Sequence, residues 1–217
     1  MESERWSTAL YLLMVRADSQ EGIMQAREFD LNIEKVLENW YVSHAVREII
    51  ANAIDEQMLT SSKDIDISKD VDGNWHIRDF GRGLQYVHLT QNENEEKMKH
   101  PGLIGKFGVG LKDALATFDR HNIGVIINSR YGHITIGKSK KHGFSDIMTL
   151  HAYIDVALDK NMEGTDFCLA GCKDSDIIAA KNYFLRFANV KCLENTEYGE
   201  LYNRRNNKSE IFINGII

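Results

Sequence analysis

Three oxygen-bearing side chains, Glu48, Asn52 and Asp55, recur at positions i, i+4 and i+7 of a segment with helical spacing. A helix advances roughly 100° per residue, so the three side chains fall within about 60° of one another on one face. A carboxylate can activate water, and an amide oxygen can enter a magnesium shell completed by water and phosphate oxygens. The pattern predicts water attack on a magnesium-bound phosphate, although by itself it also fits a solvated helix face.

Asp79 ends an expected strand and precedes Gly81 and Gly83 in the spacing D-x-G-x-G. An aspartate at this position can accept a hydrogen bond from an exocyclic amine, and a glycine lets a flat base approach the backbone. The motif therefore predicts an adenine pocket, with the hydroxyl of Thr165 as a neighbour that can satisfy the carboxylate. Aspartate and glycine also crowd turns for backbone reasons, so the motif alone is weak.

A third cluster opens an amphipathic helix and consists of Gly105, Lys106, Phe107, Gly108, Val109 and Gly110. Free backbone N–H groups and the positive end of the helix dipole can meet an anion there, which predicts a phosphate site. The alternative is a glycine-rich loop that only turns a corner. The spacing excludes both a Walker loop and the dinucleotide fingerprint.

The surrounding periodicity predicts the elements that must position these residues. Helices are expected at 4–16, 31–39, 43–59, from 110 onward and at 175–189, and a hairpin with an Asp-Gly turn at 64–68 and 75–78. Strands are expected at 123–129, 132–137, 146–155, 165–170 and 210–216, and a polar surface loop at 85–104. Helices segregated from a run of strands predict an α+β two-layer sandwich, a mostly antiparallel sheet covered on one face by helices.

Composition narrows the class of protein. The 217 residues are 43% hydrophobic and carry a net charge of −6 with no basic stripe, so nucleic acid is not expected as a direct ligand. The three cysteines include no C-x-x-C pair and are expected to be free thiols in preference to a metal site. Neither a signal peptide nor a membrane span is predicted, which favours a cytoplasmic protein without a membrane partner.

The three motifs, in this order, resemble those of the GHKL superfamily of gyrase, heat-shock chaperones, histidine kinases and MutL. The boxes are Glu48 to Asp55, Asp79 to Gly83 and Ile104 to Leu111, the last being most similar to the chaperone and MORC type. The resemblance implies the Bergerat fold over residues 31–217, an N-terminal helical extension over 1–30, and ATP or ADP with Mg²⁺ as ligands.

Under this resemblance Glu48 is the general base, Asn52 the magnesium ligand, and Asp79 the adenine ligand with Thr165 beside it. Asp55 supports the pocket, and residues 105–110 bind the phosphates under a lid formed by 85–104. The implied activity is slow hydrolysis of ATP that drives a conformational switch and a nucleotide-dependent homodimer, coupled to a further domain of a longer protein. That domain commonly supplies a cation for the γ-phosphate, for which only Lys106 and Lys112 lie near the glycine cluster.

Three alternatives stay open at this point. The chain could bind ATP or ADP as a sensor without hydrolysing it, or act as a catalytic domain of the histidine-kinase type. A scaffold that binds no nucleotide is the third.

Overall fold

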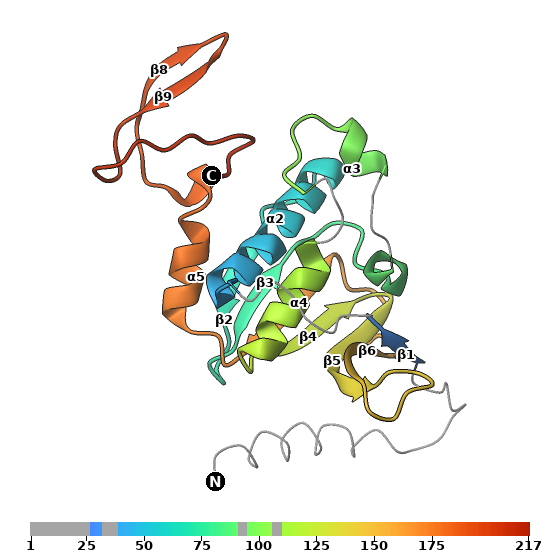
Figure 1. Cartoon of the computed structure of the whole chain (residues 1–217). Helices are drawn as coiled ribbons and strands as arrows, with labels where there is room; N and C mark the ends of the chain where they lie inside the picture. The colour runs from blue at the N-terminus through green and yellow to red at the C-terminus, as the bar shows by residue number, and fades with distance from the viewer. Residues whose placement is uncertain (1–26, 32–38, 91–94, 106–109) are drawn as a thin grey trace.

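The computed structural model describes residues 27–31, 39–90, 95–105 and 110–217. Seven strands form one antiparallel sheet in the order β1-β6-β5-β4-β7-β3-β2 (Figure 1). They are β1 (Arg27–Asp30), β2 (Asp66–Lys69), β3 (Trp75–Arg78), β4 (Gly124–Ser129), β5 (Gly132–Lys140), β6 (Met148–Asp155) and β7 (Thr165–Ala170). A separate hairpin of β8 (Cys192–Thr196) and β9 (Gly199–Tyr202) projects from the body of the molecule.

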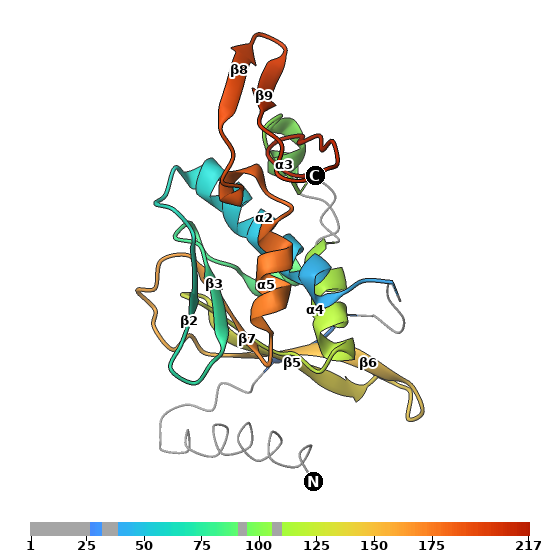
Figure 2. The ribbon, with the colours of Figure 1, turned by 90° about the vertical axis from the view of Figure 1, so that its left-hand side faces the viewer.

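Three helices cover one face of the sheet, as the view turned by a quarter shows (Figure 2). They are α2 (Val42–Thr60), α4 (Gly110–Arg120) and α5 (Asp174–Lys181). The short helix α3 (Glu95–Lys99) and the 3₁₀ turns η1 (Tyr86–Leu89) and η2 (Leu185–Phe187) lie in the connections. The expected α+β architecture, an antiparallel sheet with helices against it, is confirmed.

Side-chain periodicity explains this layering. Strand β4 turns Val125 and Ile127 toward the helices and buries them, because successive side chains of a strand point to opposite faces. On α4, Leu115 and Phe118 are fully buried, and α2 buries nine residues along its length. A single apolar core therefore lies between α2, α4, α5 and the sheet, with α2 at its centre.

Several predicted elements need correction. The segment 85–104 is not one polar loop, since it contains η1 and α3 and buries both Leu89 and Leu103. The helix expected at 175–189 ends at Lys181. The strand expected at 210–216 is wrong because Asn214 and Gly215 adopt positive φ angles and form a tight turn. The β8–β9 hairpin was not predicted.

The N-terminal segment is only partly described. Residues 27–30, placed by the sequence in a helical extension, form strand β1 at the edge of the sheet. The helix expected at 4–16 lies outside the described residues, and so does most of the one expected at 31–39. Among the helices that the structure does describe, none has both the length and the apolar character needed to span a bilayer.

Gly164 carries a structural constraint that a substitution can test. Its φ is +73°, and a Cβ there would lie 1.9 Å from the carbonyl oxygen of Asp79. Gly143 has a similar φ of +82° but nothing within 4 Å of such a Cβ. We expect Gly143→Ala to lower the free energy of unfolding by about 1 kcal/mol, the cost of the left-handed conformation, and Gly164→Ala by about 3 kcal/mol or more, because a backbone clash is added. Urea denaturation of both variants checks this, and equal losses would contradict it.

Candidate functional site

Asp55 is the most buried carboxylate of the predicted site, with a relative exposure of 0%. Its Oδ1 accepts the backbone N–H of Ile104 at 2.8 Å, and its Oδ2 accepts that of Gly105 at 2.9 Å. The ammonium of Lys97 lies 3.3 Å from Oδ2. Asp55 therefore fastens the start of the glycine cluster to α2.

Asn52 lies one helical turn before Asp55 and shares its cationic neighbour. The Asn52 Oδ1 accepts a hydrogen bond from the Lys97 Nζ at 3.1 Å. A Cβ on Gly105 would lie 3.6 Å from the same amide oxygen. The oxygen predicted to bind magnesium is thus aimed at the glycine cluster, and a lysine from α3 contacts it.

Glu48, the predicted general base, lies against the first turn of α4. A Cβ on Gly110 would lie 2.2 Å from the Glu48 Oε2, so only glycine fits there without displacing the carboxylate. The other oxygen, Oε1, accepts hydrogen bonds from the Arg47 Nη2 at 2.5 Å and Nε at 3.1 Å. The carboxylate therefore reaches the expected phosphate region while it is paired with Arg47.

Two residues of the glycine cluster, Gly105 and Gly110, are among the described residues. Gly105 lies close to the side chain of Asn52, and Gly110 lies close to that of Glu48, both in the middle of α2. Lys106, Phe107, Gly108 and Val109, which were also predicted to bind nucleotide, lie outside the described residues.

Asp79 follows β3 and is 6% exposed. Its Oδ1 accepts the backbone N–H of Gly81 at 2.9 Å, and its side chain also interacts with Thr165. Burial raises the pKa of the Asp79 carboxyl, against the opposing effect of the Gly81 hydrogen bond, and the charge of Glu56 raises it further. Burial outweighs the hydrogen bonds from Gly81 and Thr165, so the charged form of this carboxylate is disfavoured, as is often found for carboxylates in functional sites.

Thr165 lies beside Asp79, as the sequence predicted. The backbone N–H of Asp79 donates to the carbonyl oxygen of Thr165 at 3.0 Å, and the Thr165 hydroxyl accepts the N–H of Leu84 at 2.9 Å. Gly83 has a φ of +88°, and a Cβ on it would come within 3.0 Å of the Gly164 carbonyl oxygen. The D-x-G-x-G loop therefore packs backbone against backbone on the start of β7.

Sequence reasoning missed Glu56, which fixes this loop to α2. Its carboxylate accepts hydrogen bonds from the Arg82 backbone N–H at 2.8 Å and from the Arg82 Nε and Nη2, both at 2.9 Å. Burial works against the charge of Glu56, but the Arg82 hydrogen bonds outweigh it and lower the pKa. A Cβ on Gly81 would lie 2.5 Å from the Glu56 Cγ. Glu56 follows Asn52 by four residues, so helical spacing could have predicted that both lie on the same face of α2.

Lys97 and Ser129 were also missed. Lys97 lies in a polar run that was predicted to be surface loop, so no local pattern marked it as a contact of α2. Ser129 is buried at the end of β4 and donates to the carbonyl oxygen of Leu84 at 2.7 Å. Strand periodicity could have indicated its inward face but not its partner.

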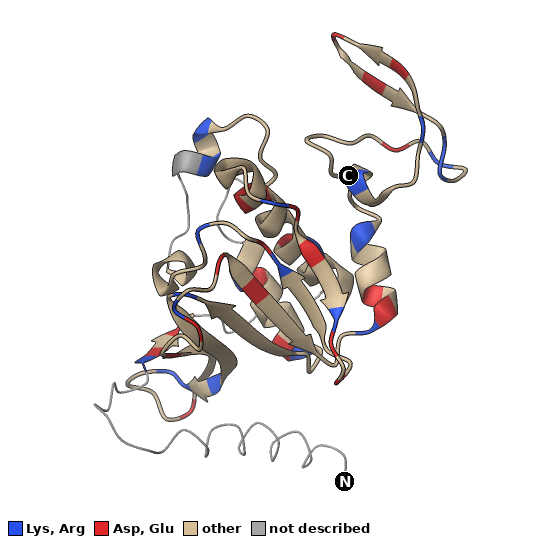
Figure 3. Ribbon diagram, turned by 180° about the vertical axis from the view of Figure 1, so that it is seen from behind, with Lys and Arg blue, Asp and Glu red and all other residues tan. Residues whose placement is uncertain are grey.

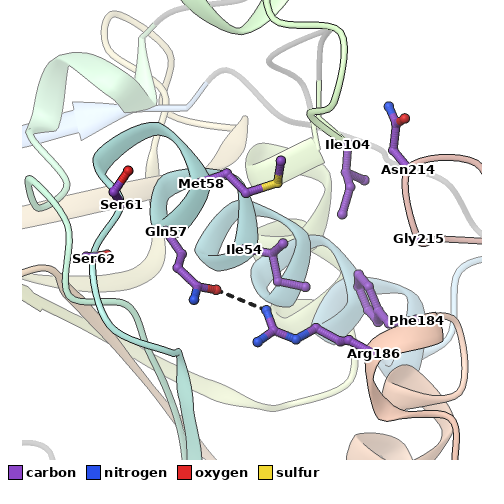
Figure 4. A pocket seen from close by; sticks show the side chains of 10 residues that line it. All are labelled: Ile54, Gln57, Met58, Ser61, Ser62, Ile104, Phe184, Arg186, Asn214 and Gly215. Carbon is purple, nitrogen blue, oxygen red and sulfur yellow. Dashed lines mark hydrogen bonds between the residues drawn. The ribbon is translucent and has the colours of Figure 1, made fainter.

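A hollow of about 520 Å³ lies beside the C-terminal half of α2 (Figure 4). One of its walls carries a hydrogen bond of 3.0 Å from Arg186 to Gln57. Neither Asn52 nor Asp79 lines it, and it contains no carboxylate, so we do not assign the predicted chemistry to it. Its lining residues are Ile54, Gln57, Met58, Ser61, Ser62, Ile104, Phe184, Arg186, Asn214 and Gly215.

Comparison with known proteins gives a relationship to a mycoplasma protein. Residues 175–217 match the family model described as Mycoplasma pneumoniae MPN635 N-terminal domain. A protein of Mycoplasma pneumoniae (strain ATCC 29342 / M129 / Subtype 1), described as an uncharacterized protein, is 38% identical over 195 residues. The match covers 88% of this chain and 78% of that protein.

This finding corrects the superfamily assignment. The match is to the mycoplasma family, and assignment to the GHKL superfamily from three short motifs is wrong. The motif residues have structural causes of their own, since Asp55 fastens a loop and the glycines at 81, 83 and 110 avoid close contacts. With 38% identity across most of both sequences, the chain belongs to the Mycoplasma pneumoniae MPN635 family.

Proposed function

We propose that the chain is an ATP-binding domain that hydrolyses magnesium-bound ATP slowly and uses the nucleotide as a conformational switch. The observation that carries the proposal is the buried carboxylate of Asp79, which lies just after the end of β3 beside Gly81 and Thr165 and has a raised pKa. An adenine amine would donate to this carboxylate. The proposal depends on this arrangement of residues and not on family membership.

The opposite end of the site supports phosphate binding. The first turn of α4 begins at Gly110, so its backbone N–H groups and the positive end of its dipole are available to an anion. Asn52 faces the same region and would join the shell of Mg²⁺ together with water and phosphate oxygens. Glu48 would then take a proton from the attacking water.

Lys97 suggests how the nucleotide acts as a switch. Its ammonium contacts the oxygens of Asn52 and Asp55, where a metal ion bound to ATP would bring its own positive charge. Mg²⁺ and Lys97 would compete for these oxygens, so Mg·ATP would release α3 from α2. The freed segment would carry the signal to a second copy of the chain or to another domain.

One observation favours a second candidate, a sensor that binds ATP or ADP without hydrolysis. The pairing of Glu48 with Arg47 removes one carboxylate oxygen from the role of base. The two functions differ only in whether Glu48 contributes to turnover.

Asp79→Asn tests the adenine pocket. Because the pKa of the Asp79 carboxyl is raised in the folded protein, its protonated form stabilises the fold. This stabilisation is complete below the pKa of the unfolded chain and is lost as the pH rises through the pKa of the folded protein. At neutral pH the neutral amide should therefore leave the free energy of unfolding unchanged or raise it, while ATP and ADP affinity falls at least about tenfold. Isothermal titration and urea denaturation measure the two effects. An unchanged affinity in a folded variant would refute the pocket.

Glu48→Gln tests the general base. We expect unchanged affinity for Mg·ATP and a loss of turnover of about 100-fold or more, in the range typical of general-base catalysis. Phosphate release under saturating ATP provides the measurement. Arg47→Ala is the matched control, because it frees the Glu48 oxygen and should raise turnover. Equal rates in all three proteins would favour the sensor.

Lys97→Met tests the switch. Removing the competing ammonium should tighten Mg·ATP binding severalfold and leave ATP binding without magnesium nearly unchanged. Titration with and without Mg²⁺ separates the two cases. Weaker binding of Mg·ATP would contradict competition and make Lys97 a phosphate ligand instead.

A further inference from the structure

The face of the sheet turned away from the helices carries a mixed cluster of nitrogen, oxygen and sulfur donors (Figure 3 shows this face). His76 on β3 and Cys168 on β7 are direct partners in the antiparallel register. Asp70 follows β2 in the turn that leads to β3. Strand pairing thus brings together His76 and Cys168, which are 92 positions apart in the sequence, and no local spacing predicts this.

The donor atoms of Asp70, His76 and Cys168 lie close enough to share one ion. A carboxylate oxygen, a ring nitrogen and the sulfur all lie within 4.8 Å of one another. The His76 Nε2 is 3.3 Å from the Asp70 Oδ2. Tetrahedral zinc with bonds of about 2.0–2.3 Å needs donor atoms roughly 3.3–3.6 Å apart. Side-chain rotations that move the donor atoms by about 1 Å would bring all three to these distances.

Asp166 orients the imidazole toward this set. Both of its carboxylate oxygens lie 3.0 Å from the His76 Nδ1. A carboxylate that holds one ring nitrogen fixes the ring and leaves the other nitrogen for a metal, an arrangement found beside most metal-binding histidines. Asp166 precedes Cys168 by two residues on β7, so the strand itself places it on the same face.

We propose that Asp70, His76 and Cys168 form a binding site for Zn²⁺ on the outer face of the sheet, with Asp166 as the positioning residue for His76. A thiolate and an imidazole select zinc over magnesium, which prefers oxygen ligands. One thiolate and one carboxylate balance the charge of the ion. Three protein ligands leave a fourth position for water, as in zinc sites that remain open to exogenous ligands.

The geometry disfavours a reactive cysteine at the same place. Burial raises the pKa of the Cys168 thiol to about 11, and the charges of Asp166 and Asp70 add to the effect. Cys168 is 9% exposed, so reagents in solution also reach it poorly. A thiol in such surroundings is a weak nucleophile without a metal ion.

This inference does not depend on the proposed nucleotide function. The side chains of Thr165 and Cys168 project from opposite faces of β7, because they are three positions apart along the strand and successive side chains alternate. Zinc binding would therefore be retained by variants that lose ATP, such as Asp79→Asn, and failure of one proposal leaves the other standing.

The test uses the full chain with Cys192→Ser, because Cys192 is an exposed thiol on β8 that would bind metal nonspecifically. We expect one equivalent of Zn²⁺ by isothermal titration, no response to Mg²⁺, and a sulfur-to-cobalt charge-transfer band on addition of Co²⁺. Cys168→Ser and His76→Ala should each weaken zinc binding at least about 100-fold and abolish or shift the cobalt band. Asp166→Asn should weaken it about 10-fold to 100-fold.

Cys172→Ser is the matched control, since Cys172 is also buried but lies outside the cluster. It should keep both zinc affinity and the cobalt band. Where a cluster variant does not fold, X-ray absorption at the zinc edge of the Cys192→Ser chain replaces it and should show sulfur in the zinc shell. No saturable zinc binding, or a zinc shell without sulfur, would overturn the proposal and leave His76 as a salt bridge between Asp70 and Asp166.

Discussion

The interaction on which the candidate site depends is the buried carboxylate of Asp55. A charge removed from water must be compensated by donors, and here two consecutive backbone N–H groups and one ammonium supply them. Because these donors come from the segment 97–105, the carboxylate fixes that segment to the central helix α2. The start of the glycine cluster and the side chain of Asn52 are brought together by this one group, and no apolar contact could fix their register so specifically.

A second constraint is the pleat of β7, which gives the two faces of the sheet different chemistry. Thr165 and Phe167 point to the helices. Thr165 contacts Asp79 there, and Phe167 packs in the apolar core. Asp166 and Cys168 point away from them and meet His76. A single strand of six residues therefore contributes to both proposed sites, and a shift of register by one residue would exchange their side chains and abolish both.

Local patterns predicted most of the fold and the helix face that carries Glu48, Asn52 and Asp55. The spacing of Leu115 and Phe118 predicted the helix, and alternation predicted β4, β6 and β7 to within two residues but ended β5 three residues early. The pairing of Glu56 with Arg82 and of His76 with Cys168 joins distant segments, so it follows from topology and not from any periodicity. The superfamily assignment failed for a related reason. Gly81, Gly83 and Gly110 each have a steric cause within this fold, so their spacing alone does not specify a lineage.

The balance between stability and function differs across the site. Glu56 and Asp55 are fully engaged by protein donors, and both fasten loops to α2. Asp79 is also buried, but burial raises the pKa of its carboxyl, so its charge costs stability. Removing Asp55 or Glu56 would leave donors without their acceptor, whereas neutralising Asp79 removes a charge that burial disfavours. That contrast separates Asp79 from Asp55 and Glu56, and it is the physical reason for centring the proposed ligand site on Asp79.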